Sequence, residues 1–285
     1  MTQPFKPSPR RRPRSARAKL FGSGQLERAV HCAVIVAHPA DEVIGAGCLI
    51  SKLAEVSVLH ITDGAPPDDE TAQQWGFSDR QTYKEQRREE TAAALALANV
   101  KQIIELHLEN QTAAHCLADL TKKITGFLQQ TGADIVVTHP YEGGHPDHDA
   151  TAFATHTATR LMRSNGMRPP DLFEMALRPD DEGRGRCCDF LTSPNQETTT
   201  LVPDECSIEL KQKMYELLAT QRESLKASVL GPEKFRQPQK YDFTMPPHEG
   251  KLHYERLNCN VSSEQWHSLA CEALKELFPQ QSAAH

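Results

Sequence analysis

The stretch that decides the fold is His31–Gly47, HCAVIVAHPADEVIGAG. Its first part, 32–37, is a short β-branched apolar run, which predicts a buried strand. The strand stops at a His-Pro pair, because proline cannot continue a central strand. Beyond this pair, apolar side chains recur at the spacing of an amphipathic helix. The residues expected on the strand-to-helix turn, where α/β sheets bind ligands, are His38, Asp41 and Glu42.

A second stretch of the same kind is Asp134–Ala150, DIVVTHPYEGGHPDHDA. A β-branched run again ends in His-Pro, and a helix is predicted after it with Asp149 as the N-cap. Two strand ends of one parallel sheet can deliver histidine and aspartate to the same rim. Zinc hydrolases use two histidines and one carboxylate, with the fourth position left to water. The two stretches therefore predict a metal site at this rim.

The order of the elements predicts an α/β protein. Further strands are expected at Val56–Thr62 and Ile103–Leu108, and helices from Arg80 and over Leu117–Gln130. Alternating strands and helices favour right-handed crossovers and a mainly parallel sheet, as in a Rossmann-like three-layer fold.

The alternation weakens beyond residue 163, where we expect a variable region of helices and short strands. Its predicted elements are strands at Leu172–Leu177 and Thr198–Val202, a turn at Gly183–Cys188, helices at Ile208–Leu225 and Ser263–Leu277, and a proline-rich loop at Val229–Tyr254.

Charge is unevenly distributed over the 285 residues. Residues 1–20 hold seven Lys/Arg and no acid, whereas the remainder holds 25 basic and 38 acidic residues. An acidic body is a poor phosphate-backbone binder, so no nucleic-acid partner is expected. We interpret 1–25 as a disordered tail, either a solvated leader or a targeting or nucleic-acid arm. A single domain then covers 26–285, with a metal-binding core at 26–165 and a substrate or lid region at 166–285.

The cysteines and the hydropathy of the chain indicate where in the cell the protein is expected. The eight cysteines form no C-x-x-C pair and are interpreted as reduced thiols of a cytoplasmic protein. No apolar run approaches the roughly 20 residues that span a bilayer. A homo-oligomer is compatible with the sequence.

The motifs HPADE (38–42) and HPDH (145–148) give the chain a resemblance to the PIG-L/LmbE-like de-N-acetylases, zinc hydrolases of N-acetylated amino sugars such as N-acetylglucosamine. The likeness runs from about His31 to Thr159 and includes Asp63-Gly64 and the Arg-x-x-Glu pattern at Arg87–Glu90. The resemblance implies that the substrate is a small N-acetylated sugar; which sugar stays open.

The resemblance also implies a role for each matching residue. The implied zinc ligands are His38, Asp41 and His148. His145 would stabilise the oxyanion or protonate the leaving amine, and Asp147 would orient a ring nitrogen. Arg87 and Asn110 would contact substrate. For Arg87 the alternative is pairing with acids on a solvated helix, and His139 is interpreted as a structural strand-end histidine rather than a fourth ligand.

Residue 40 departs from the family pattern. The family motif is His-Pro-Asp-Asp-Glu, and its first Asp is the general base, but here that residue is Ala40. A methyl group cannot accept a proton, and general base catalysis contributes about 10²–10⁴-fold, so metal binding should persist while turnover falls. Three explanations stay open: an inactivating substitution, a natural pseudoenzyme, or another acid (Asp147 or Glu42) as base. The rival outside this class is a metal-stabilised binding protein.

Substrate specificity is expected to depend on two loops, Ala65–Arg80 and Val229–Tyr254. The second carries Tyr241, Phe243, His248 and Tyr254. These aromatic side chains either form a wall or lid over the zinc or anchor the loop to the body.

Overall fold

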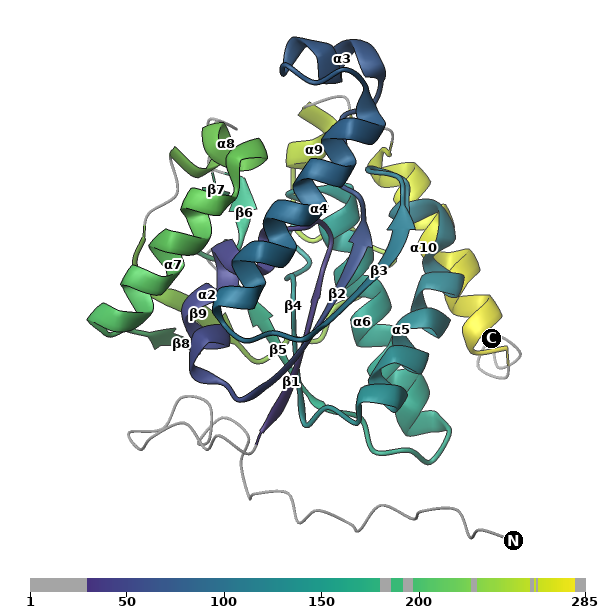
Figure 1. The fold of residues 1–285 in the computed structure, drawn as a ribbon. Helices are drawn as coiled ribbons and strands as arrows, with labels where there is room; N and C mark the ends of the chain where they lie inside the picture. Colours follow the sequence, from purple (N-terminus) through teal and green to yellow (C-terminus); the bar gives the residue numbers. More distant parts are fainter. Residues whose placement is uncertain are drawn as a thin grey trace, which may run out of the picture.

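A seven-stranded sheet lies at the centre of the molecule (Figure 1), with strand order β3-β2-β1-β4-β5-β9-β8. The computed structural model describes residues 30–179, 186–191, 197–226, 230–256, 259 and 261–279. The strands are β1 His31–Val36, β2 Glu55–Thr62, β3 Gln102–Leu108, β4 Ile135–Thr138, β5 Asp171–Met175, β8 Thr198–Leu201 and β9 Glu233–Arg236. β1 to β5 are mutually parallel, and β9 pairs antiparallel with β5 and β8. The α/β expectation is confirmed.

Helices cover both faces of the sheet. One apolar cluster joins the sheet to α2 (Asp41–Lys52), α4 (Arg80–Leu97) and α7 (Glu205–Leu217). The other joins it to α5 (Leu117–Thr131), α6 (Pro146–Ser164) and α10 (Ser263–Leu277). The shorter elements are α3 Asp69–Gln74, η1 Ala113–Cys116, β6 Arg178–Pro179, β7 Arg186–Cys187, η2 Ala219–Gln221, α8 Arg222–Lys226 and α9 His253–Arg256. In the part of the chain that is described, no helix is long and apolar enough to cross a membrane.

The central position of β1 explains its continuous apolar sequence. Successive side chains of a strand point to opposite faces, and here both faces are covered: Val34 belongs to one apolar cluster and Ile35 to the other. Val34 is in register with Val58 of β2 and Val137 of β4. Because β1 and β4 are parallel neighbours, the two His-Pro turns that follow them meet at one edge of the sheet.

Three sequence predictions need correction. Helix α6 begins at Pro146 with His145 as its N-cap, not at Asp149, because proline suits the first helical position. The Asp149 carboxylate instead accepts hydrogen bonds from the N–H groups of Glu142 and Gly143, at 3.3 and 3.1 Å.

The other two corrections concern element boundaries. The stretch 65–80 is not only a loop but contains α3, and the helix expected over 208–225 is broken after α7 into η2 and α8. The predicted tail, 1–25, and most of the predicted turn at 183–188 lie outside the described residues.

Helix α2, which starts at the metal-site turn, is kinked and held by the C-terminal region. Ala46 is non-helical (φ −143°, ψ 15°), and the N–H groups of Cys48 and Leu49 donate to the Glu233 carboxylate at 2.7 and 2.9 Å. Lys211 Nζ donates to the Ile44 carbonyl and to Glu233 Oε1, both at 2.7 Å. Burial lowers the pKa of Lys211, but the charge and hydrogen bond of Glu233, together with smaller contributions from Tyr215 and Cys188, outweigh burial and raise the pKa. A buried ion pair thus replaces the helix's own missing hydrogen bonds.

Replacing Glu233 tests this support. Glu233→Gln leaves the Lys211 charge buried without its anion, so the free energy of unfolding should fall by about 3–5 kcal/mol. The measurement is chemical denaturation of both proteins. Glu276→Gln, which breaks the exposed pair with Lys122, is the control and should change stability far less. Equal effects in the two variants would contradict the assigned role of Glu233.

Candidate metal centre and substrate cavity

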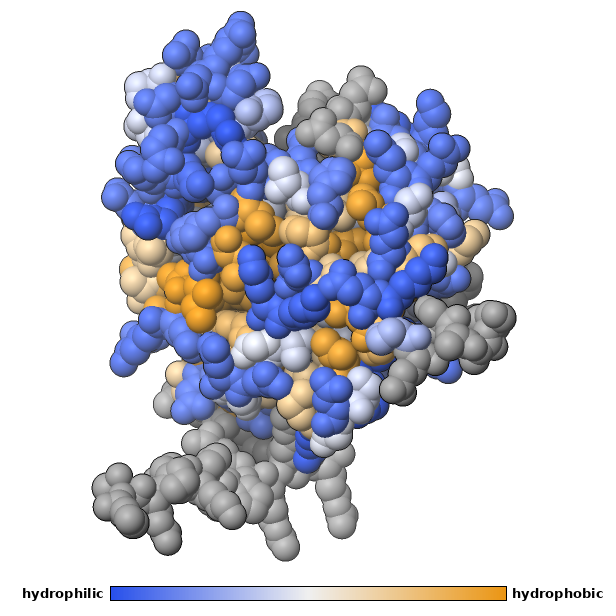
Figure 2. Space-filling view, turned by 90° about the vertical axis from the view of Figure 1, so that its right-hand side faces the viewer, coloured by the Kyte–Doolittle hydropathy of each residue, from blue (hydrophilic) through white to orange (hydrophobic). Residues whose placement is uncertain are grey.

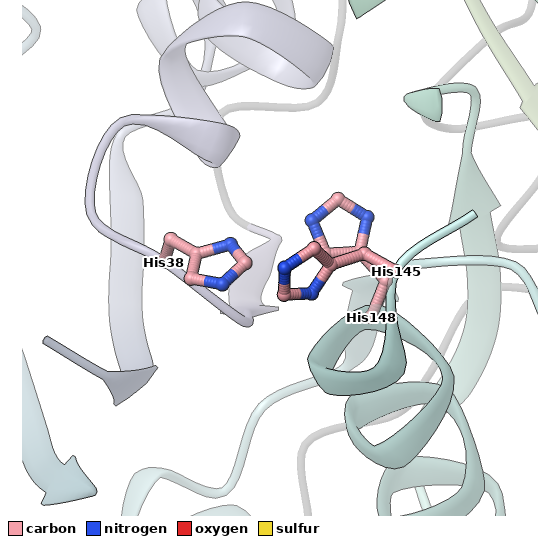
Figure 3. Close-up of side chains that lie close together, drawn as sticks. All are labelled: His38, His145 and His148. Carbon is pink, nitrogen blue, oxygen red and sulfur yellow. The ribbon is translucent and has the colours of Figure 1, made fainter. Parts of the chain in front are cut away.

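Asp41 lies at the centre of a histidine cluster. Its Oδ2 atom is 3.0 Å from Nδ1 of His38 and 3.2 Å from Nε2 of His148. Asp41 is the first residue of α2, His38 belongs to the turn before it, and His148 lies in the first turn of α6. In Figure 3 the ring of His38 faces the rings of His148 and His145 across the gap between the two turns. The structure therefore brings the three predicted ligands together.

The donor set fits a zinc ion. Two overlapping groups of side chains have ligand atoms that all lie within 4.8 Å of one another: His38, His145 and His148, and Asp41, His139 and His148. Neither group alone is the predicted set of His38, Asp41 and His148, but together the two groups contain all three residues. Tetrahedral zinc with bonds of about 2.0–2.2 Å needs donor atoms roughly 3.4 Å apart, which is close to the two Asp41–histidine distances. Imidazole nitrogen and carboxylate oxygen are donors that zinc accepts.

Electrostatics keep Asp41 ionised. Burial raises the pKa of Asp41, but the charges and hydrogen bonds of His148 and His38 together outweigh burial and hold the pKa well below the usual value. Burial likewise lowers the pKa of His38, whereas Asp41 and Asp147 raise it, and the net direction is upward. The cluster thus contains an anionic oxygen at the point where a cation would sit.

His139 is fully buried and holds the His148 ring in place. Its Nε2 atom accepts a hydrogen bond from the N–H of Ala37 at 3.0 Å. Its ring stacks on His148 with centroids 3.9 Å apart. These contacts agree with the structural interpretation of His139, although its Nε2 is also 3.5 Å from Asp41 Oδ2.

His145 and Asp147 lie at the start of α6. His145 Nδ1 accepts a hydrogen bond from the Asp147 N–H at 3.2 Å, so in the neutral ring the proton is on Nε2. Asp147 Oδ2 lies 3.3 Å from His38 Nε2. The two carboxylate oxygens of Asp147 also accept the N–H groups of Gln111 and Ala113, at 2.6 and 3.1 Å. Asp147 therefore fixes both His38 and the loop after β3.

Asn110 and Arg87 also contact the site. Asn110 Oδ1 is 3.1 Å from His38 Nε2, and its Nδ2 donates to the Ala65 carbonyl at 2.9 Å. Arg87 is buried and donates to the Pro39 carbonyl from Nε and Nη2, at 3.2 and 2.8 Å, and to the Gly64 carbonyl from Nη1. It joins the turns after β1 and β2 instead of pairing with acids on a solvated surface. Substrate contact by either residue stays a prediction.

Ala40 has an unusual backbone conformation. Its φ is 86° and its ψ −15°, in the left-handed region, which costs an L-residue with a Cβ roughly 1–2 kcal/mol. Aspartate, asparagine and glycine occur there more readily. Ala40 is 1% exposed and joins the apolar cluster beside α2. The turn thus holds alanine in a conformation that favours another residue type.

A cavity of about 950 Å³ opens from the cluster. His38, His145, Asn110 and Arg87 line it at the metal centre. Further lining comes from 64–67, from the end of α3 and the residues that follow it, from α4 and from 219–223, and includes Trp75, Phe77, Tyr83 and Gln221. Trp75 and Phe77 lie within 65–80, the first of the two loops expected to affect specificity, whereas sequence reasoning missed Tyr83 and Gln221.

The aromatic residues of 229–254 anchor this segment to the body. Tyr241 and Phe243 contact Tyr141, with ring centroids 5.7 and 4.9 Å apart. The Trp266 Nε1–H donates to the Phe243 carbonyl at 2.9 Å. Tyr254 is fully buried, whereas His248 is exposed. The structure favours the anchoring alternative for these three aromatic side chains over the lid.

Residues 33–159 match the family model described as PIG-L: GlcNAc-PI de-N-acetylase. This part of the chain is similar to a PIG-L domain. The resemblance to the PIG-L/LmbE-like de-N-acetylases is confirmed. A search of curated protein sequences found no match.

Solved structures share the fold. The A40926 pseudoaglycone deacetylase Dbv21 superposes with a TM-score of 0.57 at 19% identity, over 74% of this chain and 99% of that one. The N,N'-diacetylchitobiose deacetylase from Pyrococcus horikoshii gives 0.51 at 21% identity, over 72% and 82%. The 4-carboxy-2-hydroxymuconate hydratase GalB from Pseudomonas putida gives 0.52 at 18% identity, over 75% and 99%. Because a hydratase shares the architecture, the reaction has to be inferred from the site.

Metal content tests the ligand set. The purified protein should contain about one zinc per chain, and His148→Ala should lose it, because His148 is held against Asp41 at the centre of the cluster. The measurement is elemental analysis, with circular dichroism to verify folding. His248→Ala, at an exposed histidine, is the control and should keep its zinc. Full zinc occupancy in His148→Ala would show that the ligands are assigned wrongly.

Proposed function

We propose that this protein hydrolyses the N-acetyl group of an N-acetylated amino sugar with the help of zinc, and that Ala40 slows the reaction in this sequence. The observation that carries the proposal is the convergence of Asp41, His38 and His148 beside His145 at one end of the cavity. The cytoplasmic location expected from the cysteines is part of the proposal; the seven cysteines whose side chains are described are free thiols.

The residues around the cluster have distinct parts in this chemistry. A bound zinc ion would polarise the acetyl carbonyl and lower the pKa of water. His145 lines the cavity, and its Nδ1 accepts the Asp147 N–H, so its neutral ring carries the proton on Nε2, from which it would donate a hydrogen bond to the developing oxyanion. Asp147 and Asn110 contact Nε2 of His38 and fix its ring.

The general base belongs at residue 40, because the other acids near the cluster have partners. Both Asp147 oxygens accept main-chain N–H groups. The Glu42 carboxylate is fully buried and lies 3.2 Å from His60 Nε2. The left-handed conformation at residue 40, which aspartate adopts more readily than alanine, also supports an acid at this position.

The second candidate function is a catalytically silent, metal-stabilised sugar-binding protein, favoured by Ala40 itself. It predicts sugar binding without acetate release, also after an acid has been introduced at residue 40.

Ala40→Asp separates the two functions. Acetate release from a panel of N-acetylated sugars should rise by about 10²–10⁴-fold, while zinc content, measured by elemental analysis, should not change because residue 40 is not a ligand. The control is Ala40→Asn, which has nearly the same shape but cannot accept a proton and should stay as slow as the parent. If Ala40→Asp is no faster than Ala40→Asn on a substrate that the parent turns over, another residue is the base.

A further inference from the structure

Helix α10 carries a thiol–imidazole pair outside the cavity described above. The Sγ atom of Cys271 lies 3.7 Å from Nε2 of His267, which is one helical turn before it. We propose that Cys271 is a modification site, whose thiol attacks low-molecular-weight disulfides and becomes a mixed disulfide, with His267 as the base. The inference is independent of the proposed function, because neither residue belongs to the metal centre or lines its cavity.

The imidazole of His267 is oriented to accept the thiol proton. Its Nδ1 atom lies 2.6 Å from the carbonyl oxygen of Thr244. Because a carbonyl oxygen can only accept, Nδ1 carries the ring proton, and in the neutral ring the lone pair of Nε2 faces Cys271 Sγ. A nucleophile, a base and a group that orients the base are therefore in contact in the order that an activated nucleophile requires.

A carboxylate supports the imidazolium that forms when His267 takes this proton. Hydrogen bonds from the hydroxyl and the N–H of Thr244 lower the pKa of Asp242, and the charge of His267 lowers it further. The segment is fixed against α10 by the Nε1–H of Trp266, which donates to the Phe243 carbonyl at 2.9 Å. An anion held beside an imidazole favours its charged form, and a cationic histidine in turn favours a neighbouring thiolate.

Helix α10 lies on the outside of the molecule. It forms the right-hand edge in Figure 1, and Figure 2 shows this side facing the viewer, with hydrophilic and hydrophobic side chains interspersed. His267 is exposed and Cys271 is partly exposed. A small disulfide in solution can therefore reach the thiol, and access is the second condition for reactivity besides ionisation.

Four other cysteines are protected by burial. The Cys32 and Cys48 thiols are buried, which raises the pKa of each to about 12; in Cys48 the charge of Glu233 adds to this effect. Burial also raises the pKa of Cys116 and Cys259. A buried thiol that keeps its proton is a poor nucleophile.

Two more cysteines have no imidazole to take their proton. The Cys188 thiol is partly buried and donates to the Ile44 carbonyl at 3.9 Å, an oxygen that cannot remove the proton. Cys206 is exposed, and its thiol has no hydrogen-bond partner among the described residues. Because Cys206 lies in the first turn of α7, where a thiolate is favoured, it is the competing site against which Cys271 has to be compared.

The reaction needs no oxidant other than the disulfide itself. His267 Nε2 takes the thiol proton, and Cys271 Sγ attacks one sulfur of the disulfide. A new S–S bond forms as the old one breaks, and the second sulfur leaves as a thiolate that takes the proton back from His267. Cys271 is oxidised to a mixed disulfide, and the other half of the reagent is reduced to a free thiol.

Reaction of the reduced full chain with dithiobis(nitrobenzoate), an aromatic disulfide that releases a coloured thiolate, tests the proposal. The absorbance should show a fast phase of about one thiol per chain, about tenfold faster than the next phase, and Cys271→Ser should abolish it. In His267→Asn the amide can still donate to the Thr244 carbonyl but cannot take a proton, so this phase should slow about tenfold. Ser268→Ala, at an exposed neighbour on α10, is the matched control and should keep the parent rate.

Glutathione disulfide gives a second readout that needs no variant. The full chain is treated briefly, quenched with acid and digested. Peptide mass spectrometry should then find the glutathione adduct on Cys271 before it appears on Cys206.

Three results would overturn the proposal. A fast phase that persists in Cys271→Ser would place the reactive thiol elsewhere, and earlier modification of Cys206 would assign it to the start of α7. A parent-like rate in His267→Asn, with circular dichroism showing a folded protein, would remove the histidine from the reaction. None of these measurements depends on zinc or on acetate release, which test the proposed function separately.

Discussion

The site depends on one buried carboxylate. Asp41 Oδ2 lies within 3.5 Å of nitrogens from three imidazoles, those of His38, His148 and His139. The same oxygen accepts the N–H of His38 at 3.1 Å. A buried anion is stable only beside opposite charge or donors, so these histidines have to converge on it. That convergence is possible because β1 and β4 are parallel neighbours that end at one edge of the sheet.

The C-terminal region supports the core in addition to extending it. Glu233 enters the kink of α2, whose first residue is Asp41. Arg236, also on β9, donates to Glu174 Oε2 at 2.7 Å and lies 3.0 Å from Glu142 Oε1, just after β4. Strand β9 therefore contacts α2, which follows the first strand-end turn, and the segment just after β4, which leads into the second turn. The region predicted to be variable, 166–285, thus contacts segments next to both turns.

The fold and the histidine cluster could be predicted because they depend on local patterns: an apolar run stopped by His-Pro, followed by helical spacing. The cavity wall could not, because Tyr83 is adjacent to 219–223 only in the folded chain. The buried position of Arg87 could not be predicted from local sequence patterns either, because its acceptors are main-chain carbonyls 48 and 23 residues away. The expected N-cap of α6, Asp149, is wrong because the proline at the first helical position sets the start of the helix at Pro146.

The central claim is that the two strand-end turns bind zinc through imidazole nitrogen and carboxylate oxygen. X-ray absorption at the zinc edge of the purified protein tests it most directly. The account predicts nitrogen and oxygen neighbours at about 2.0–2.2 Å, with the outer-shell scattering of two imidazoles. Sulfur neighbours at about 2.3 Å, from any of the eight cysteines, would contradict it.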